Sequence, residues 1–299
     1  MSTGQHFPVA IVGVGNMGGG MARRLLSLGW PVTVCDLISS RMQALESFGA
    51  VARDNPAQAA INSITVIVCV VDAVQTQEVL FGPKGIATIM QPGQTVLLCP
   101  TLALDDVVRF SAELVLRGLH TVDAPMSGGP QRAQDGSMSL MLAGDKAVLL
   151  RHEALLAALS NKRFVISERV GDAARTKLVN NLAAGINLVG AAEVMAMAQS
   201  FGLDLTATLN VIEQSSGQSW IGTDRMRRAI AGDYAPRAHM TLLQKDTRLA
   251  IEAAQAAGFN GPLGAAARDV FAKASAAGLA DLDDAALLTW LSTGPSGPK

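Results

Sequence analysis

Short apolar runs alternate with amphipathic stretches along the first half of the chain. Runs rich in Val, Ile, Leu and Cys predict buried strands, and apolar residues three and four positions apart predict helices. Glycines follow several of these helices, as expected where a helix ends. The predicted strands are 9–12, 32–35, 65–71, 95–99, 119–123, 139–143 and 164–166, with a short one from Val51, and the predicted helices among them are 21–26, 41–48, 105–117 and 146–159.

The strand pattern disappears after residue 168, and helical runs separated by Gly and Pro follow. This order predicts an α/β Rossmann doubly wound sheet followed by an all-α C-terminal domain, joined by a long helix. We expect an NAD-binding domain over 1–168 and a substrate and oligomerisation domain over 169–299, ending in a loose tail from residue 294. The predicted helices of the second domain are 171–197, 205–215, 217–231, 240–257, 262–277 and 285–292.

The long helix predicted from residue 171 is apolar nearly all round, which predicts that it is buried. Its first turns nevertheless carry Lys177, Asn180 and Asn181, and positions three and four apart lie on one face of a helix. A buried lysine is costly unless it is paired or has a function. We therefore expect this face to close an active site whose other half lies upstream.

Composition and charge narrow the function classes. The chain has 299 residues, of which 49% are hydrophobic and 16% charged, and its net charge is −1. These values predict neither nucleic-acid nor membrane-surface binding. No uninterrupted apolar run reaches the ~18 residues of a membrane span, and the first residues lack the basic and apolar regions of a secretory signal. We expect a soluble cytoplasmic enzyme.

The three cysteines, Cys35, Cys69 and Cys99, fall in predicted strands. They have no metal-ligand spacing and no neighbouring His cluster. We interpret them as reduced, buried residues that act as small apolar side chains, and we expect no metal site.

A glycine-rich turn follows the first predicted strand. Gly13, Gly15 and Gly18 form Gly-x-Gly-x-x-Gly between a strand and a helix, and the second strand ends at an acid, Asp36. Glycines let the backbone approach a pyrophosphate, and the helix N-terminus favours its charge. A carboxylate at Asp36 suits the ribose hydroxyls of NAD and repels a 2′-phosphate, so NAD is favoured over NADP. Arg41 could in principle reach a 2′-phosphate.

A second candidate site follows the strand that ends at Asp123. Ligands of open α/β sheets bind beyond the carboxyl ends of the strands. Ser127, Gly128 and Gly129 offer a hydroxyl and backbone N–H groups, which suit a carboxylate. A flexible turn explains the same residues, and the pattern alone does not separate the two readings.

Four motifs span nearly the whole chain: Gly13 to Gly18 with Asn16 and Met17 inside it, 123–129, 171–181, and Lys245-Asp246. In this order they resemble the β-hydroxyacid dehydrogenase family, which includes 3-hydroxyisobutyrate dehydrogenase and tartronate semialdehyde reductase.

The resemblance implies roles for single residues. Lys177 would be the catalytic general acid and base. Asn181 would hold the substrate together with Ser127, Gly128 and Gly129. Asp72 stands where many members have Asn, so that cofactor contact stays undecided. Asp246 would close the pocket. The residues that the resemblance implies for cofactor binding are Gly13, Gly15, Asn16, Met17, Gly18, Asp36, Thr101 and Lys245.

The C-terminal half most resembles the L-threonate dehydrogenase branch of the family. The segments that carry this likeness are 216–220, 225–227, 232–237 and 281–284, with 79–85 upstream. This resemblance implies that the enzyme oxidises L-threonate to its 2-oxo acid. The alternatives are the activities of 3-hydroxyisobutyrate dehydrogenase and tartronate semialdehyde reductase. Trp220 and Arg225 are candidates for the pocket wall, or else ordinary packing and a surface salt bridge.

Two other classes share this outline. A dinucleotide-binding sensor would need neither Lys177 nor the Ser-Gly-Gly turn. Imine reductases commonly have another residue at the lysine position. Lys177 and the Ser-Gly-Gly turn therefore favour a dehydrogenase. Few charges and the long helix also predict a homodimer or homotetramer formed through the helical domain.

Overall fold

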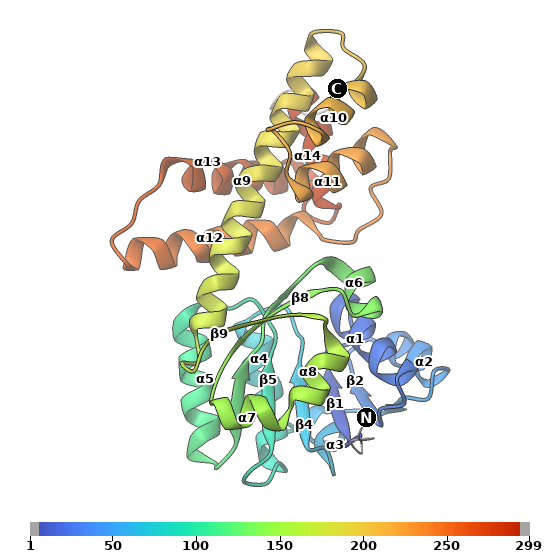
Figure 1. Ribbon diagram of the computed structural model, residues 1–299, viewed down its shortest axis with the longest axis vertical. Helices are drawn as coiled ribbons and strands as arrows, with labels where there is room; N and C mark the ends of the chain where they lie inside the picture. Colours follow the sequence, from blue (N-terminus) through green and yellow to red (C-terminus); the bar gives the residue numbers. More distant parts are fainter. Residues whose placement is uncertain (1–5, 294–299) are drawn as a thin grey trace. The chain divides into compact units, whose positions relative to one another are not determined.

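The computed structural model describes residues 6–293, so the predicted tail from residue 294 lies outside the described residues. The chain divides into two compact units, Met1–Lys177 and Leu178–Lys299. The first is an α/β unit and the second is helical (Figure 1). The long helix α9, Asp172–Ser200, begins in the first unit and continues through the second. The division therefore falls within this helix, later than the boundary expected at residue 168.

The first unit is built on one sheet, with nine strands among residues 6–293. The order is β3-β2-β1-β4-β5-β6-β8-β7, with β9 beside β8. The strands β1 to β6 are parallel, which confirms the doubly wound sheet. The sequence did not predict that β8 runs antiparallel to β6 and β7. The strands are β1 Val9–Val12, β2 Val32–Cys35, β3 Val51–Ala52, β4 Thr65–Val68, β5 Thr95–Leu98, β6 His120–Asp123, β7 Met126–Ser127, β8 Ser139–Ala143 and β9 Lys162–Ser167.

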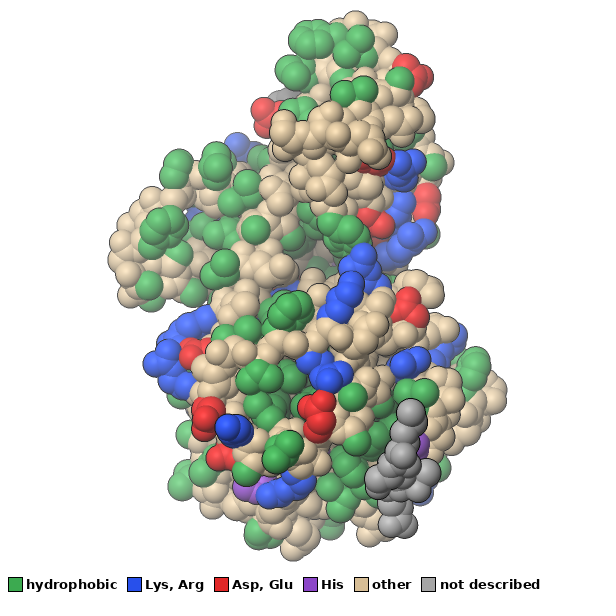
Figure 2. All heavy atoms as spheres, viewed as in Figure 1, with side chains coloured by type: hydrophobic (Ala, Val, Ile, Leu, Met, Phe, Trp, Pro, Cys, Tyr) green, Lys and Arg blue, Asp and Glu red, His purple; other side chains and the backbone are tan. Residues whose placement is uncertain are grey.

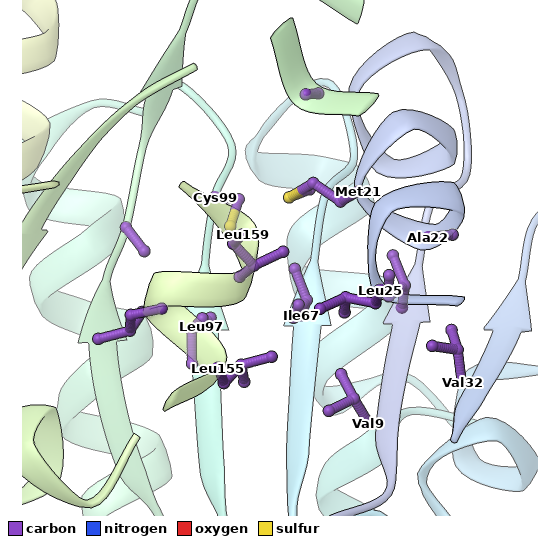
Figure 3. Close-up of a cluster of buried hydrophobic side chains, with 14 of the residues drawn as sticks. Val9, Met21, Ala22, Leu25, Val32, Ile67, Leu97, Cys99, Leu155 and Leu159 are labelled. Carbon is purple, nitrogen blue, oxygen red and sulfur yellow. The ribbon is translucent and has the colours of Figure 1, made fainter. Parts of the chain in front are cut away.

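Helices cover both faces of this sheet because successive strand residues point to opposite faces. Val9 and Ile11 belong to one buried cluster, whereas Ala10 and Val12 belong to another. Figure 3 shows the first cluster, where side chains of α1 and α8 meet those of the strands. The helices of this unit are α1 Asn16–Ser27, α2 Ser39–Glu46, α3 Pro56–Ala60, α4 Ala73–Phe81, α5 Leu104–Leu116, α6 Gly129–Asp135, α7 Lys146–Arg151 and α8 Glu153–Leu159.

Two sequence expectations in this unit need correction. The helix predicted over 146–159 is two helices, broken at the buried His152. The strand predicted over 65–71 ends at Val68, so Cys69 follows the strand and is only half-buried. Cys99 likewise follows β5. The thiol pKa of Cys69 is raised to about 12 by burial, which agrees with an unreactive side chain.

The helical unit packs α9 against α10 to α14. Gly185 of α9 lets the helices approach, since a Cβ there would lie 2.6 Å from a side-chain atom of Thr247 and 3.3 Å from one of Phe271. Leu188, Ala192 and Met195 continue this buried face. The remaining helices are α10 Leu205–Glu213, α11 Trp220–Ile230, α12 Met240–Ala256, α13 Pro262–Ala274 and α14 Leu287–Thr293.

Buried ion pairs join the segments that carry the likeness to the L-threonate branch. Asp283 accepts backbone N–H groups of Arg237 at 2.8 Å and Ala238 at 3.1 Å, and pairs with the Arg228 guanidinium at 3.0 Å. The neighbouring Asp284 pairs with Arg225 at 2.5 Å. Segments far apart in sequence therefore meet around two buried carboxylates.

The helix α9 is not buried all round, contrary to expectation. It is long and apolar enough to cross a membrane by length and composition, yet only 33% of its most apolar window is buried. Asn180 is exposed, while Lys177 and Asn181 are each 7% exposed. Lys177 and Asn181, four residues apart, therefore share the buried side of the helix, and Asn180 does not.

Candidate active site

The glycine turn between β1 and α1 has the geometry of a pyrophosphate-binding loop. Gly13 has φ +90, and a Cβ there would lie 2.5 Å from the Cys69 carbonyl oxygen. A Cβ at Gly18 would lie 1.9 Å from the Gly13 carbonyl oxygen, so only glycine permits this strand–helix approach. The nearest atom to a Cβ at Gly15 would be Arg41 Nη1, 3.7 Å away. Gly15 thus presents open backbone before Asn16 and Met17 begin α1, as a bound diphosphate requires.

The carboxylate of Asp36 is held beside this turn. Its Oδ2 accepts the Val14 N–H at 2.8 Å, and its Oδ1 accepts the Ile38 N–H at 2.9 Å. Each oxygen keeps further acceptor capacity for a ribose hydroxyl. Arg41 Nη1 lies 3.5 Å from Oδ1, so a cation stands next to both Asp36 and Gly15. The turn and the acid therefore fit a dinucleotide.

The carboxyl ends of the parallel strands bring the other first-unit candidates to one sheet edge. Thr101 follows β5, and Ser127 ends the short strand β7, which comes directly after β6 in the chain. Asp72, the departure from the family pattern, caps α4 by accepting the Gln75 N–H at 2.8 Å. Its side chain thus has a structural role.

The Ser127-Gly128-Gly129 turn uses a backbone that only glycine adopts readily. Gly128 has φ +132 and Gly129 has φ +79. A Cβ at Gly129 would meet no atom within 4 Å, so the backbone is open there. Arg132 lies against the turn, since a Cβ at Gly128 would be 2.9 Å from its Cδ. Such an open turn, with a hydroxyl and a neighbouring cation, suits a carboxylate.

Asp123 fixes the first turn of α9 to the end of β6. Its Oδ2 accepts the Gly171 N–H and the Ala174 N–H, both at 2.9 Å. This carboxylate is 1% exposed, and burial raises its pKa to about 6 although the hydrogen bonds oppose the shift. Lys177 follows Ala174 by three residues. The lysine and the Ser127 turn are therefore both anchored near the end of β6.

A second polar network lies within the helical unit. Asn181 Nδ2 donates to Asp246 Oδ2 at 2.5 Å, and Asn180 Nδ2 donates to Asn181 Oδ1 at 3.0 Å. Lys245 Nζ lies 3.2 Å from Asp246 Oδ1. Three residues that the resemblance assigns to the site, Asn181, Lys245 and Asp246, are thus brought together.

The two candidates for the pocket wall, Trp220 and Arg225, differ in burial. Trp220 opens α11 and is about half-exposed. Arg225 is not a surface salt bridge, since its side chain is 13% exposed and its partner Asp284 is 1% exposed. Burial raises the pKa of Asp284 to about 6. The ion pair therefore joins α11 to the segment that carries Asp284 within the helical unit.

Sequence reasoning missed two contributions to the site. It treated Asp123 only as a strand end, although a buried acid before Ala-Pro could have been read as a helix anchor. It also did not consider Arg132, whose position four residues after Gly128 is compatible with contact across one helical turn. Among residues 6–293 no group of three or more His, Cys, Asp and Glu residues could hold a metal ion.

A glycine loop at the edge of a doubly wound sheet, with a buried lysine and a helical second unit, defines an NAD(P)-linked dehydrogenase. Comparison with known proteins agrees. A family model described as the NAD binding domain of 6-phosphogluconate dehydrogenase matches residues 8–167. A second, described as NAD-binding of NADP-dependent 3-hydroxyisobutyrate dehydrogenase, matches residues 171–291.

Three similar proteins cover nearly the whole chain. L-threonate dehydrogenase of Escherichia coli O6:H1 is 35% identical over 289 residues, which is 96% of each chain. The structure of 3-hydroxyisobutyrate dehydrogenase from Salmonella typhimurium has a TM-score of 0.90 at 34% identity, covering 95% of this chain and 99% of that one. Psf3 in complex with NADP+ and 2-OPP has a TM-score of 0.87 at 25% identity, covering 94% and 99%.

The chain belongs to the β-hydroxyacid dehydrogenase family. It is a hydroxyacid dehydrogenase with NAD(P)-binding domains.

Alanine substitutions at Gly18 and Gly15 of the nucleotide loop should have different effects on stability and on cofactor binding. Gly18→Ala places a Cβ on the Gly13 carbonyl and should lower the melting temperature of the protein without ligand. Gly15→Ala has room in the fold, so the same melting temperature should stay unchanged while NADH affinity falls about tenfold, ~1.4 kcal/mol. Thermal melts and NADH fluorescence titrations measure both. Equal melting temperatures for the two variants would contradict this reading.

Variants of Asp123 test the anchor of α9. Asp123→Ala leaves two N–H groups without their acceptor and should cost about 1–3 kcal/mol for each buried group. Asp123→Asn keeps an acceptor oxygen and should be milder. Because the pKa rises from 3.8 to about 6 on folding, the native state holds an extra proton between these pH values. The contribution of Asp123 to stability therefore falls as the pH rises from 3.8 to about 6.

Urea denaturation across this pH range measures the effect. The fall in unfolding free energy between pH 3.8 and about 6 should be smaller in Asp123→Asn than in the unmodified protein, because the amide does not titrate. An identical slope in both proteins would exclude Asp123 as the titrating group.

Proposed function

We propose that this enzyme oxidises L-threonate to its 2-oxo acid with NAD, using Lys177 as general acid and base. Two observations support L-threonate as the substrate. The C-terminal segments resemble the L-threonate branch, and a relative named L-threonate dehydrogenase is 35% identical to this chain. The neighbour named 3-hydroxyisobutyrate dehydrogenase keeps 3-hydroxyisobutyrate as the main alternative.

The Ser127 hydroxyl and the Gly128 and Gly129 N–H groups bind the substrate carboxylate in this proposal. Their open, positive-φ backbone supports that role. The neutral amine of Lys177 accepts the proton of the hydroxyl being oxidised, and returns it in the reverse direction. Bound NAD would supply the acceptor for the hydride that leaves the carbon bearing this hydroxyl.

The hydrogen bonds of Asp123 carry the proposal. They fix the turn of α9 that precedes Lys177 to the strand from which the Ser127 turn continues. A general base must be held at a reproducible distance from the proton it removes, since small displacements lower the rate strongly. Asn181, hydrogen-bonded to Asp246, supplies an amide already oriented by its neighbours.

We infer that NAD is the cofactor. Both oxygens of Asp36 are held by backbone N–H groups beside the glycine loop, where the carboxylate can accept ribose hydroxyls. Its negative charge opposes a 2′-phosphate. Arg41 is the group that would favour NADP. It lies 3.5 Å from Asp36, which supports a role as the ion-pair partner of this carboxylate and not as a binder of the 2′-phosphate.

We also place the enzyme in the cytoplasm. Cys35, Cys69 and Cys99 are free thiols, as is usual for proteins of a reducing compartment.

Replacing Lys177 tests the chemistry. Lys177→Ala should lower kcat by far more than tenfold, a loss above about 1.4 kcal/mol, while NADH binding stays within a few-fold. Initial rates at the NADH absorbance band, with L-threonate, D-glycerate and 3-hydroxyisobutyrate side by side, measure the effect and rank the substrates. A variant that keeps more than a tenth of kcat would exclude the role of Lys177. Absence of turnover with all hydroxy acids would instead favour a non-catalytic dinucleotide sensor.

Replacing Asp36 tests the cofactor. Asp36→Ala removes the ribose acceptor and the charge, so kcat/KM with NAD should fall at least tenfold and the preference for NAD over NADP should shrink. Arg41→Ala is the matched control, and it should leave the preference for NAD intact. A wild-type enzyme with higher kcat/KM for NADP would overturn the assignment.

A further inference from the structure

A cavity lined by cations lies between helices α12 and α13 of the helical unit (Figure 1). Its volume is about 270 Å³, and it is called the α12–α13 cavity below. Lys245 and Arg248 line it from α12 and Arg268 from α13, whereas none of the described residues that line it is acidic. Figure 2 shows Lys and Arg side chains beside α13 on this part of the helical unit. The remaining lining residues are neutral and are Thr241, Gln244 and Ala272.

The packing of α12 on α13 explains why the two arginines meet. The helices are joined by a short connection, which makes them antiparallel neighbours. Gly264 of α13 permits their close approach, since a Cβ there would lie 2.7 Å from Ile251 Cδ1 of α12. Arg268 follows Gly264 by about one helical turn, and Arg248 precedes Ile251 by nearly one turn. In an antiparallel pair these two steps go the same way, so both side chains reach one cavity.

The acidic partners of these arginines are not among the residues that line the cavity. Arg248 pairs with Glu252 at 2.8 Å, and Arg268 pairs with Asp269 at 2.8 Å. Both carboxylates are more than half-exposed, so each is a surface ion pair that contributes little free energy. A guanidinium has five N–H donors, which leaves donors for an anion that contacts both arginines.

The lining of the cavity matches a small anion that also carries hydroxyl groups. Two guanidinium groups and one ammonium group favour a ligand group with several oxygens and more than one negative charge, as in a phosphate. The Thr241 hydroxyl and the Gln244 amide add donors and acceptors that suit hydroxyl groups. The volume of about 270 Å³ lies just below the ~300–1,000 Å³ of pockets for drug-sized ligands, so it suits a small metabolite and not a dinucleotide.

We propose that the α12–α13 cavity is a second ligand site, which binds a small phosphate monoester such as a sugar phosphate. Apart from Lys245, its lining residues have no part in the proposed dehydrogenase site, so the inference goes beyond that function. Lys245 links the two sites. Its Nζ lies 3.2 Å from Asp246 Oδ1, and Asp246 accepts the Asn181 amide. A phosphate in the cavity would therefore contact the side chain that pairs with this buried network.

Titration calorimetry with sn-glycerol 3-phosphate tests the proposal. Saturating NADH keeps the glycine loop occupied, and physiological ionic strength screens general charge attraction. The wild type should bind one phosphate ester per chain, and Arg268→Gln should raise the dissociation constant at least tenfold. Lys273→Gln is the matched control, because it removes one positive charge from an exposed position of α13 outside the cavity. It should change the dissociation constant by less than about twofold, and thermal melts check that both variants fold.

A second ligand and a double variant identify what binds and where. Succinate carries two negative charges without a phosphate, and it should bind more weakly than sn-glycerol 3-phosphate. The variant Arg248→Gln/Arg268→Gln should show no saturable binding. Binding that persists in this variant would place the anion at another site, such as the Ser127 turn, and would overturn the proposal. The same holds for a wild type that shows no saturable binding, for equal losses in Arg268→Gln and Lys273→Gln, or for tighter binding of succinate.

Discussion

The buried carboxylate of Asp123 is the constraint on which the rest of the first unit depends. A helix N-terminus has backbone N–H groups without helical partners, and Asp123 accepts two of those at the start of α9. The interaction is costly to bury, as the raised pKa of Asp123 indicates, but it sets where the longest helix begins. The turn that leads to Lys177 is thereby joined to the strand that continues into the Ser127 turn.

Each unit holds part of the proposed site. The first gathers the glycine loop, Asp36 and the Ser127 turn at the carboxyl edge of parallel strands, where several backbones offer N–H groups together. The second holds Asn181, Asp246 and Lys245 in one buried network. In the proposed function the first unit also supplies the Ser127 turn and Lys177, and the second supplies the oriented amide of Asn181.

The two sides of helix α9 differ in burial. Its buried side packs on the helical core through Gly185 and Leu188 and carries Asn181. Its other side carries exposed apolar residues, among them Val194 and Met197. Because apolar residues occur on both sides, the sequence shows little helical amphipathicity, and hydrophobicity alone predicts a fully buried helix. The burial of individual residues distinguishes the core face from the exposed face.

The sequence by itself determined the fold class and the nucleotide loop, because both depend on local patterns. Alternating strands and helices, and glycines at 13, 15 and 18, are signals read within about thirty residues. Only the tertiary structure decided the antiparallel β8, the exposure of Asn180 and the role of Asp123. These depend on contacts between residues far apart in the chain, such as the 48 positions between Asp123 and Gly171. Periodicity carries no information about such partners, because a carboxylate at a strand end looks the same whether or not a distant helix begins on it.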